Sequence, residues 1–249
     1  MPTFLGTASG DRITPSALSA GVTANGAVRP SDLADSLDGA GGDDTLDGGG
    51  GADTLSGGEG ADSLLGGAGR DLVAGNRGAD VVSLGADDDT FLWNPGDGDD
   101  TVDGGAGSDV LQLNGASIAE RFTLFAGDGH AQLTRDVGVA HLDLTGMETL
   151  TVRALGGADV FTIGNLAGTG VTQVNVDLSG PAGTPDDAAD VVIVGGGDNA
   201  DQLSASLTNG GVTVLGLAER VAVLGADGLD TVLVDGRAGV DAFTFNGSA

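Results

Sequence analysis

Aspartate recurs at nearly even intervals through the first half of the chain, and this spacing has a clear chemical meaning. The chain has 33 Asp but only 4 Glu among its 249 residues, so the shorter carboxylate is preferred. Aspartate is compact, suits tight turns and is a hard oxygen ligand for cations. The recurring residues are Asp44, Asp53, Asp62, Asp71, Asp80, Asp89, Asp100 and Asp109. Their spacing predicts columns of carboxylates that bind metal ions.

Each of these aspartates is the sixth residue of a nine-residue unit, G-G-x-G-x-D-x-U-x, where U is aliphatic or Phe. The interval is nine residues throughout, except for eleven between Asp89 and Asp100, where Trp93 and Asn94 are extra. Four units match the template in full, three depart from it once and one departs twice. The units begin at Gly39, Gly48, Gly57, Gly66, Gly75, Leu84, Pro95 and Gly104. Tandem units of this kind indicate a solenoid.

The nonapeptide divides into a turn and a strand. The glycines of G-G-x-G-x-D allow positive φ and a close approach of backbone carbonyls, which favours a tight turn. The last three residues, x-U-x, predict a short strand with U pointing inward. Two units then form one flattened coil, and successive coils stack as parallel strands. The predicted buried column is Leu46, Leu55, Leu64, Val73, Val82, Phe91, Val102 and Leu111.

The ligand types indicate which cation suits these turns. Carboxylates and backbone carbonyls form an all-oxygen shell, which fits Ca²⁺ with its about six to eight ligands in irregular geometry. Mg²⁺ needs stricter octahedral placement and keeps its waters. Zn²⁺ prefers His or Cys, and the chain has no Cys and only His130 and His141. The predicted cofactor is therefore Ca²⁺, with several ions bound.

On these nonapeptides, residues 39–112 resemble the RTX, or haemolysin-type, calcium-binding repeats of bacterial secreted proteins. The resemblance implies a parallel β-roll in which sixth-position aspartates and turn carbonyls bind Ca²⁺ between neighbouring coils. It places Asp44, Asp62, Asp80 and Asp100 on one edge, and Asp53, Asp71, Asp89 and Asp109 on the other. The chain departs from the family pattern at Arg70, Asn76 and Arg77, which is expected to weaken the sites at Asp71 and Asp80. In the unit of Asp89, Asp87 stands where the pattern has glycine.

The predicted fold is all-β, a right-handed parallel β-roll or β-helix solenoid with a less regular C-terminal β-helix extension. The predicted domains are a divergent repeat with a cap or loop over residues 1–30, the calcium-binding β-roll over 31–113, and the extension over 114–249. Short strands are expected in the extension, and Leu207–Val214, with its Asn-Gly pair, suits a tight hairpin. Weaker echoes of the unit keep Asp11, Asp159, Asp201, Asp230 and Asp241, which we interpret as turn caps rather than metal ligands.

Composition and motifs exclude several function classes. A formal net charge of −28 argues against nucleic acid and against anionic membrane surfaces as partners. No apolar run is long enough to span a membrane. No P-loop, G-x-S-x-G or H-E-x-x-H motif is present, so the chain is predicted not to be an enzyme. Trp93 is interpreted as a packing residue at the insertion, with a carbohydrate platform as the alternative.

The sequence thus predicts a calcium-binding structural or interaction module that folds when Ca²⁺ binds after secretion. Two alternatives stay open: a cell-surface adhesin or carbohydrate-binding solenoid, and an enzyme with an unrecognised site in the C-terminal half. The N-terminal residues lack the basic and apolar regions of a cleaved signal peptide. The resemblance implies export by a type I route, to the extracellular space or the cell surface. An extracellular polysaccharide or surface partner is compatible with this but is not specified.

Overall fold

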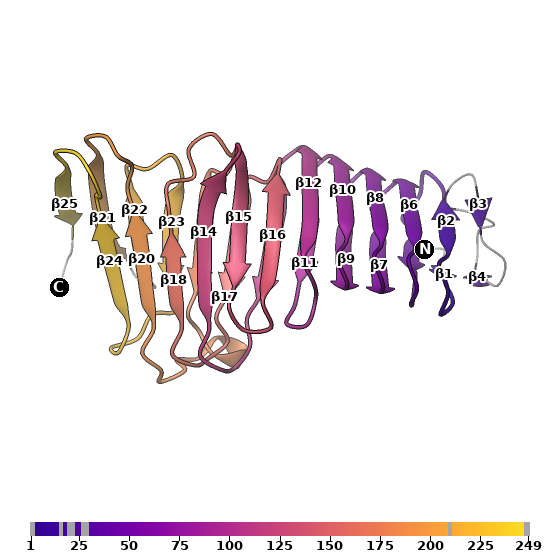
Figure 1. Cartoon of the computed structure of the whole chain (residues 1–249), viewed down its shortest axis with the longest axis horizontal. Coiled ribbons are helices and arrows are strands. Elements are labelled where there is room, and N and C mark those ends of the chain that lie inside the picture. Colours follow the sequence, from indigo (N-terminus) through magenta and orange to yellow (C-terminus); the bar gives the residue numbers. More distant parts are fainter. Residues whose placement is uncertain (1–2, 15–16, 19–22, 26–29, 209–210, 247–249) are drawn as a thin grey trace. The chain divides into compact units, whose positions relative to one another are not determined.

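The computed structural model describes residues 3–14, 17–18, 23–25, 30–208 and 211–246. These residues form β-strands and no α-helix, with one short 3₁₀ turn at Pro181–Gly183 (Figure 1). The chain divides into two compact units, Met1–Gln112 with His141–Met147, and Leu113–Ala140 with Glu148–Ala249. The all-β class predicted from the sequence is confirmed. Much of the cap or loop expected within residues 1–30 lies outside the described residues.

Strands of the first unit are short and regularly spaced along the chain. They are β1 (Thr3–Leu5), β2 (Arg12–Thr14), β3 (Ala17–Leu18), β4 (Thr23–Asn25), β5 (Ser36–Asp38), β6 (Thr45–Gly50), β7 (Thr54–Glu59), β8 (Ser63–Ala68), β9 (Leu72–Arg77), β10 (Val81–Ala86), β11 (Thr90–Trp93), β12 (Asp100–Ala106) and β16 (Ala140–Thr145). A further strand, β13 (Val110–Asn114), begins in the first unit.

From β5 to β12 successive strands alternate between two sheets, so each coil adds one strand to each sheet. The strand orders are β4-β1-β5-β7-β9-β11 and β3-β2-β6-β8-β10-β12-β16. Pairing is parallel from β1 and β2 onward, whereas β1 with β4 and β2 with β3 are antiparallel. This arrangement is a β-roll solenoid, as the nonapeptides predict.

The repeat strands are longer than the sequence predicts. Only x-U-x was expected to be extended, but β6 and β7 each continue through the first three residues of the next unit. Gly49 pairs with Gly67, and Gly50 pairs with Ala68, in the parallel ladder. Coils on both sides offer partners to these backbone groups, which overrides the low strand propensity of glycine. Only the last part of each predicted turn, such as residues 51–53, leaves the sheet.

The eighth residue of every unit faces the interior, as predicted. Leu46 pairs with Leu64 and Val82 with Val102, so the column stays in register from coil to coil. All eight side chains of the column are between 0% and 2% exposed. The same alternation buries the first residue of every unit except the one that begins at the exposed Pro95; this residue is usually glycine and is Leu84 in one unit. The first-position residue and the aliphatic column therefore share the interior of the roll.

The second unit has longer connections between its strands. Its strands are β14 (Arg121–Gly127), β15 (His130–Arg135), β17 (Thr149–Arg153), β18 (Val160–Ile163), β19 (Gln173–Asp177), β20 (Val191–Gly195), β21 (Gln202–Thr208), β22 (Gly211–Leu215), β23 (Arg220–Leu224), β24 (Thr231–Asp235) and β25 (Ala242–Asn246). The short strands expected for the extension are thus observed.

Parallel stacking continues in the second unit, but antiparallel strands interrupt it. One sheet runs β14-β18-β20-β24 in parallel, with β15 antiparallel to β14. The other runs β17-β19-β23 in parallel, then turns back through β22 and β21, and β25 adds parallel to β21. Thr208 pairs with Gly211, which confirms the predicted hairpin, although its two turn residues lie outside the described residues. The less regular β-helix predicted for this part is thus observed.

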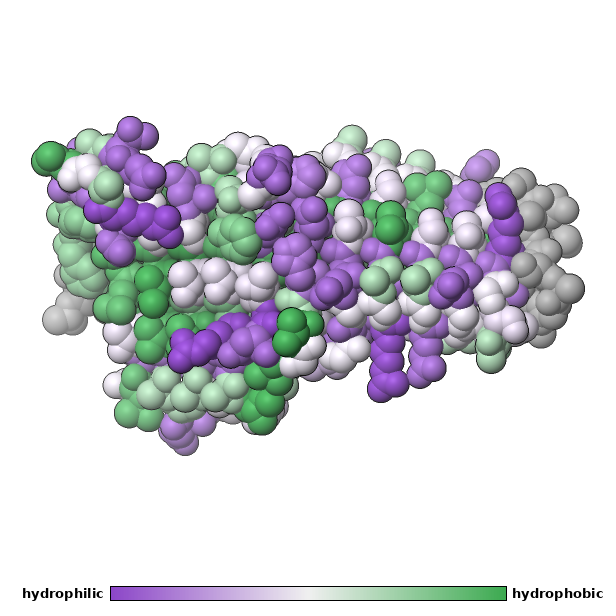
Figure 2. All heavy atoms as spheres, viewed as in Figure 1, coloured by the Kyte–Doolittle hydropathy of each residue, from purple (hydrophilic) through white to green (hydrophobic). Residues whose placement is uncertain are grey.

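The core of the second unit is aliphatic and contains one aromatic pair. The rings of Phe122 and Phe161 stack with centroids 5.0 Å apart. Near β24 and β25 the apolar side chains are no longer buried, since Leu233 is 48%, Phe243 56% and Phe245 71% exposed. Figure 2 shows apolar surface over this part of the unit, in contrast to the largely polar surface of the repeat coils.

Candidate metal centre

Hydrogen bonds join the sixth-position aspartates of neighbouring coils into two ladders. In each rung the backbone N–H of one aspartate donates to Oδ1 of the aspartate one coil further on, at 2.7–3.0 Å. One ladder contains Asp44, Asp62, Asp80 and Asp100, and the other contains Asp53, Asp71, Asp89 and Asp109. The structure therefore brings together the two sets that the resemblance implies. That these residues bind metal stays a prediction.

The ladders begin earlier than the strict repeats. The N–H of Asp11 donates to Oδ1 of Asp44, and that of Asp35 donates to Oδ1 of Asp53 at 2.7 Å. Both residues belong to weak echoes of the nonapeptide, and both are buried. Their Oδ2 atoms accept hydrogen bonds within their own turns, from Thr7 and from Ser31. These two aspartates thus close their own turns, as the cap interpretation of Asp11 predicts.

The second carboxylate oxygen of the ladder aspartates has a different environment. Oδ2 is buried and has no hydrogen-bond partner in Asp44, Asp53, Asp62, Asp71, Asp80, Asp89 and Asp100. These side chains are only 1–2% exposed, so water does not solvate the orphaned oxygens. A buried carboxylate oxygen without a donor is costly, because nothing compensates for the lost hydration. A bound cation would remove this cost, and the site therefore fits calcium.

The first-position glycines explain how backbone oxygens reach the same place. A Cβ on Gly66 would lie 2.6 Å from Oδ2 of Asp71 and 2.5 Å from the carbonyl oxygen of Leu84, one coil on. The same two kinds of oxygen flank Gly48, where they belong to Asp53 and Gly66. A carboxylate and a backbone carbonyl thus converge where any other residue would place a side chain. The first-position residue is Leu84 in the unit of Asp89, so that unit lacks this cradle.

Fourth-position glycines have a separate role in the turn. Gly60 and Gly78 have φ of 136° and 146°, in the left-handed region that side chains disfavour. Asp87 occupies this position in one unit and still adopts φ of 80°. The glycine template thus combines a steric requirement at position one with a backbone requirement at position four.

Burial raises the pKa of the ladder carboxylates. Loss of hydration is the main cause, and neighbouring carboxylates add to it, while the hydrogen bond from the preceding aspartate opposes it. The pKa rises to about 6 for Asp44, Asp53, Asp71, Asp80 and Asp89, and to about 8 for Asp100. Without a cation, the protein therefore disfavours the charged form that its own sequence places there.

Side-chain carboxylates do not make these sites alone. Within the described residues, no group of three or more His, Cys, Asp or Glu side chains is arranged to hold a metal ion. Each site therefore depends on backbone carbonyls for the rest of its ligands. This agrees with the preference of Ca²⁺ for mixed carboxylate and carbonyl oxygens.

Two of the departures from the family pattern point away from the ladders. The guanidinium of Arg70 pairs with Asp88 at 3.1 Å and that of Arg77 pairs with Glu59 at 3.2 Å. Both arginine side chains are more than 70% exposed. Asn76 adopts φ of 66°, so it keeps the backbone form of the glycine it replaces. These residues leave the carboxylate column unbroken.

The two-residue insertion packs without breaking the ladder. Trp93 is 1% exposed and its Nε1–H donates to the carbonyl oxygen of Gly98 at 3.1 Å. The N–H of Asn94 donates to Asp97 at 2.6 Å, which closes the bulge. Asp80 and Asp100 remain joined across the longer interval, at 3.0 Å. Trp93 is thus a packing residue, as predicted.

A family model of the RTX calcium-binding nonapeptide repeat matches residues 31–64, 56–91 and 96–115. The chain carries RTX calcium-binding repeats. The matches coincide with the coils whose aspartates form the two ladders, so the RTX repeats account for the orphaned carboxylate oxygens. The RTX repeat is a structural, calcium-binding element, and calcium is the cofactor that it implies. A comparison with curated proteins finds no match to the chain.

The second unit has an acidic ladder that the sequence analysis only partly anticipated. The N–H of Glu120 donates to Asp159, that of Asp159 to Asp190, and that of Asp190 to Asp230, at 2.8–2.9 Å. A separate rung joins Asp201 to Asp241 at 3.0 Å. Asp159, Asp201, Asp230 and Asp241 belong to echoes of the nonapeptide, whereas Glu120 and Asp190 were not predicted from the sequence. Each of these two acids does keep one local feature of the nonapeptide, because it stands two residues before a buried apolar strand residue.

Other features of the described residues offer little chemistry. A cavity of about 640 Å³ lies in the second unit and is lined mostly by aliphatic residues, with Phe245, Asp227 and Asp230. His141 lies on β16 and donates its backbone N–H to Asp99. The described residues include no helix that is both long and apolar enough to cross a membrane.

Proposed function

We propose that this protein is an extracellular structural or interaction module whose repeat coils fold when Ca²⁺ binds. The observation that supports this is the row of buried Oδ2 atoms without partners, one for each coil edge from Asp44 to Asp100. Bound calcium supplies positive charge and coordination to these oxygens. The ligands we propose are Asp44, Asp53, Asp62, Asp71, Asp80, Asp89, Asp100 and Asp109, with turn carbonyls.

The charge of the chain supports a coupling between binding and folding. The chain has a net charge of −28, and the pKa values of its ladder carboxylates are raised. Folding without cations is therefore unfavourable, because it brings carboxylates together out of water. A ligand that binds only the folded form stabilises it by mass action. Calcium is scarce inside cells, and extracellular modules bind it with dissociation constants of about 10⁻⁴–10⁻³ M. The repeats would thus stay unfolded during export and fold outside.

Trp93 gives a direct test, because it is the only tryptophan, is buried, and donates a hydrogen bond to Gly98, two residues before Asp100. The full chain is freed of metal and then given millimolar Ca²⁺ or Mg²⁺, while Trp93 emission and far-ultraviolet circular dichroism are recorded. We expect Ca²⁺, but not Mg²⁺, to shift the emission to shorter wavelength and to raise the strand signal. A buried Trp93 in all three conditions would contradict calcium-dependent folding.

A matched pair of variants tests the proposed ligands. Asp53→Asn/Asp71→Asn keeps the shape of both side chains but removes two carboxylate charges. We expect calcium affinity, measured by isothermal titration, to fall at least about tenfold, because Ca²⁺ prefers charged oxygen ligands. The control Asp32→Asn/Asp103→Asn changes the same charge at exposed residues and should leave the affinity unchanged. Equal affinities for the two variants would remove Asp53 and Asp71 from the ligand set.

A further inference from the structure

Three carboxylates of the second unit resemble the ladder aspartates in one respect. Asp159, Asp186 and Asp190 each keep a buried Oδ2 with no hydrogen-bond partner. Asp159 and Asp190 are both 0% exposed. All three lie outside the residues that the RTX family model matches. The family repeat therefore does not account for them.

Contacts bring these three residues into one neighbourhood. The N–H of Asp159 donates to Oδ1 of Asp190 at 2.8 Å, so the two turns are directly stacked. Asp186 approaches the turn before Asp159, because its Oδ2 lies 3.7 Å from where a Cβ on Gly156 would stand. Oδ1 of Asp186 already accepts the N–H of Ala188 at 3.1 Å, which fixes the side chain. The pKa of Asp159 rises to about 8 and that of Asp190 to about 6, by burial first and then by charges that include Asp186.

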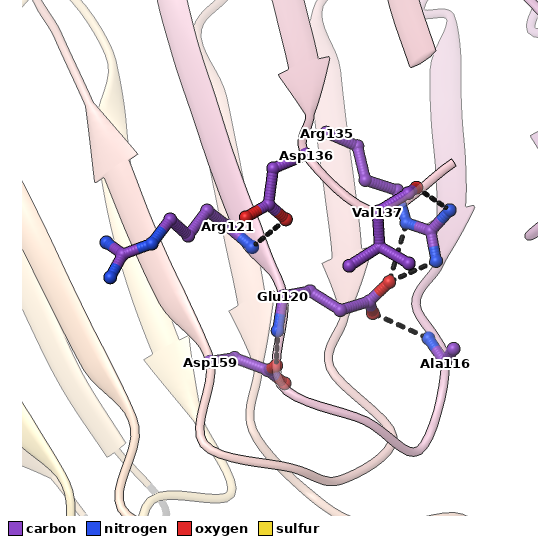
Figure 3. Close-up of polar contacts among 7 residues, drawn as sticks. All are labelled: Ala116, Glu120, Arg121, Arg135, Asp136, Val137 and Asp159. Carbon is purple, nitrogen blue, oxygen red and sulfur yellow. Dashed lines mark hydrogen bonds and ion pairs between the residues drawn. The ribbon is translucent and has the colours of Figure 1, made fainter. Parts of the chain in front are cut away.

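The first acid of the same ladder is neutralised by the protein itself. Oε1 of Glu120 accepts hydrogen bonds from Nε and a terminal nitrogen of Arg135, and Oε2 accepts the N–H of Ala116 at 2.6 Å (Figure 3). Both partners of the ion pair are almost fully buried. Figure 3 shows that the Arg135 side chain reaches Glu120, while Arg121 extends away from it. One rung therefore has a cation of its own, and the next two rungs do not.

We propose that the stacked Asp159 and Asp190 turns form a second divalent-cation site outside the RTX repeats, that Asp186 adds a nearby negative charge, and that calcium is the ion. The donors are carboxylate oxygens in tight turns, which suit a hard cation with irregular coordination. No cluster of three metal-binding side chains is found among the described residues, so backbone carbonyls complete the shell, as in the repeats. Arg135 takes the place of a metal at the Glu120 rung. The site is thus bounded by an internal guanidinium on one side.

Hydrogen–deuterium exchange of the full chain, read peptide by peptide, separates this site from the repeats. The metal-free protein is compared with protein in Ca²⁺ at about ten times the apparent dissociation constant. Opening of a ligand-bound turn should then become about tenfold rarer. We expect peptides covering residues 154–163 and 186–195 to exchange correspondingly more slowly in Ca²⁺. If they do not change while repeat peptides do, the second site is wrong and the proposed function stands.

Variants assign that protection to the named carboxylates. Asp159→Asn/Asp190→Asn should abolish the calcium-dependent protection of these two peptides and keep it in the repeats. Asp128→Asn/Asp198→Asn, which changes the same charge at exposed residues of the same unit, should behave as the parent. If the first variant does not fold, Asp186→Asn alone should still shift protection to several-fold higher Ca²⁺. Unchanged protection in Asp186→Asn, or in a folded double variant, would overturn the proposal.

Discussion

The two units of this protein solve one problem, the burial of stacked acidic turns, in two ways. From Asp44 to Asp100 the coil edges of the repeats offer the same carboxylate, with Oδ1 bonded to a neighbouring amide and Oδ2 orphaned. In the second unit the stacked acids are further apart in the chain, and the first of them is satisfied by Arg135. Under the proposed function the repeats need an external cation along this whole row, whereas the second unit carries part of its countercharge. This difference predicts that metal removal affects the repeats first.

Turn composition explains why the units differ. Nine-residue units leave no room for a long basic side chain inside a glycine turn, since a Cβ at the first position already meets a carboxylate. The second unit has antiparallel β15 beside β14, and this strand ends with Arg135 next to the Glu120 turn. An extra strand can therefore deliver a guanidinium to a place that a repeat cannot reach. Regular repetition and internal charge compensation are alternatives.

The largest effect is expected from a charge in the aliphatic column of the repeats. Leu55→Asp places a carboxylate among residues that are at most 2% exposed, without a partner. We expect the repeat coils to lose folding even in millimolar Ca²⁺, seen as loss of the cooperative Trp93 emission transition on heating. Val81→Asp is the control, because Val81 is 59% exposed, and it should change the midpoint little. A parent-like melt of Leu55→Asp would show that the column does not stabilise the coils.

The second effect concerns the internal cation. Arg135→Gln leaves Glu120 buried without its ion-pair partner, and breaking a buried pair costs about 3–5 kcal/mol. We expect this loss in denaturant unfolding followed by circular dichroism, with Trp93 emission in Ca²⁺ nearly unchanged. Glu120→Gln/Arg135→Gln should recover much of the stability, while Arg121→Gln, at an exposed residue, should be neutral. If Arg135→Gln lowers the Trp93 transition as strongly, the two units are not independently stabilised.

The smallest expected effect is the change in stability of the metal-free protein with pH. Because the folded pKa of five ladder aspartates is raised from 3.8 to about 6, and that of Asp100 to about 8, the metal-free folded form binds protons more tightly than the unfolded chain. Its stability is then greatest near or below pH 4 and falls as pH rises to about 8. Calcium needs the deprotonated form, so the gap between melting temperatures with and without Ca²⁺ should widen over the same range.

Thermal melts in metal-free and calcium-containing buffers from pH 4 to 8 measure this directly. The Trp93 transition reports on the repeats, and exchange in peptides of the second unit reports on the Asp159 and Asp190 turns. A metal-free form that grows more stable with rising pH would contradict the burial of charged ladders.

Much of the repeat unit was predictable because its information is local. The nonapeptide contains the turn glycines, the ladder aspartate and the buried aliphatic residue within one short stretch, and each acts on the next coil through the same interval. The second unit was only partly predictable, since its ladder acids are 39, 31 and 40 residues apart. No period marks them, so the pairing of Glu120 with Asp159 and of Asp159 with Asp190 emerges only when the coils are stacked. The length of each excursion, rather than any motif, sets which acids meet.

By itself the sequence determined the all-β coil, its aliphatic column, the two aspartate sets and the oxygen chemistry that suits calcium. These follow from residue size, backbone freedom and charge, which act over a few residues. Only the tertiary structure decided that strands run on through the glycines, because coils on both sides supply backbone partners there. It also decided that Oδ1 of a ladder aspartate accepts a backbone N–H while Oδ2 is buried without a hydrogen-bond partner. The pairing of Arg135 with Glu120 likewise depends on an antiparallel strand, a long-range contact that no local pattern encodes.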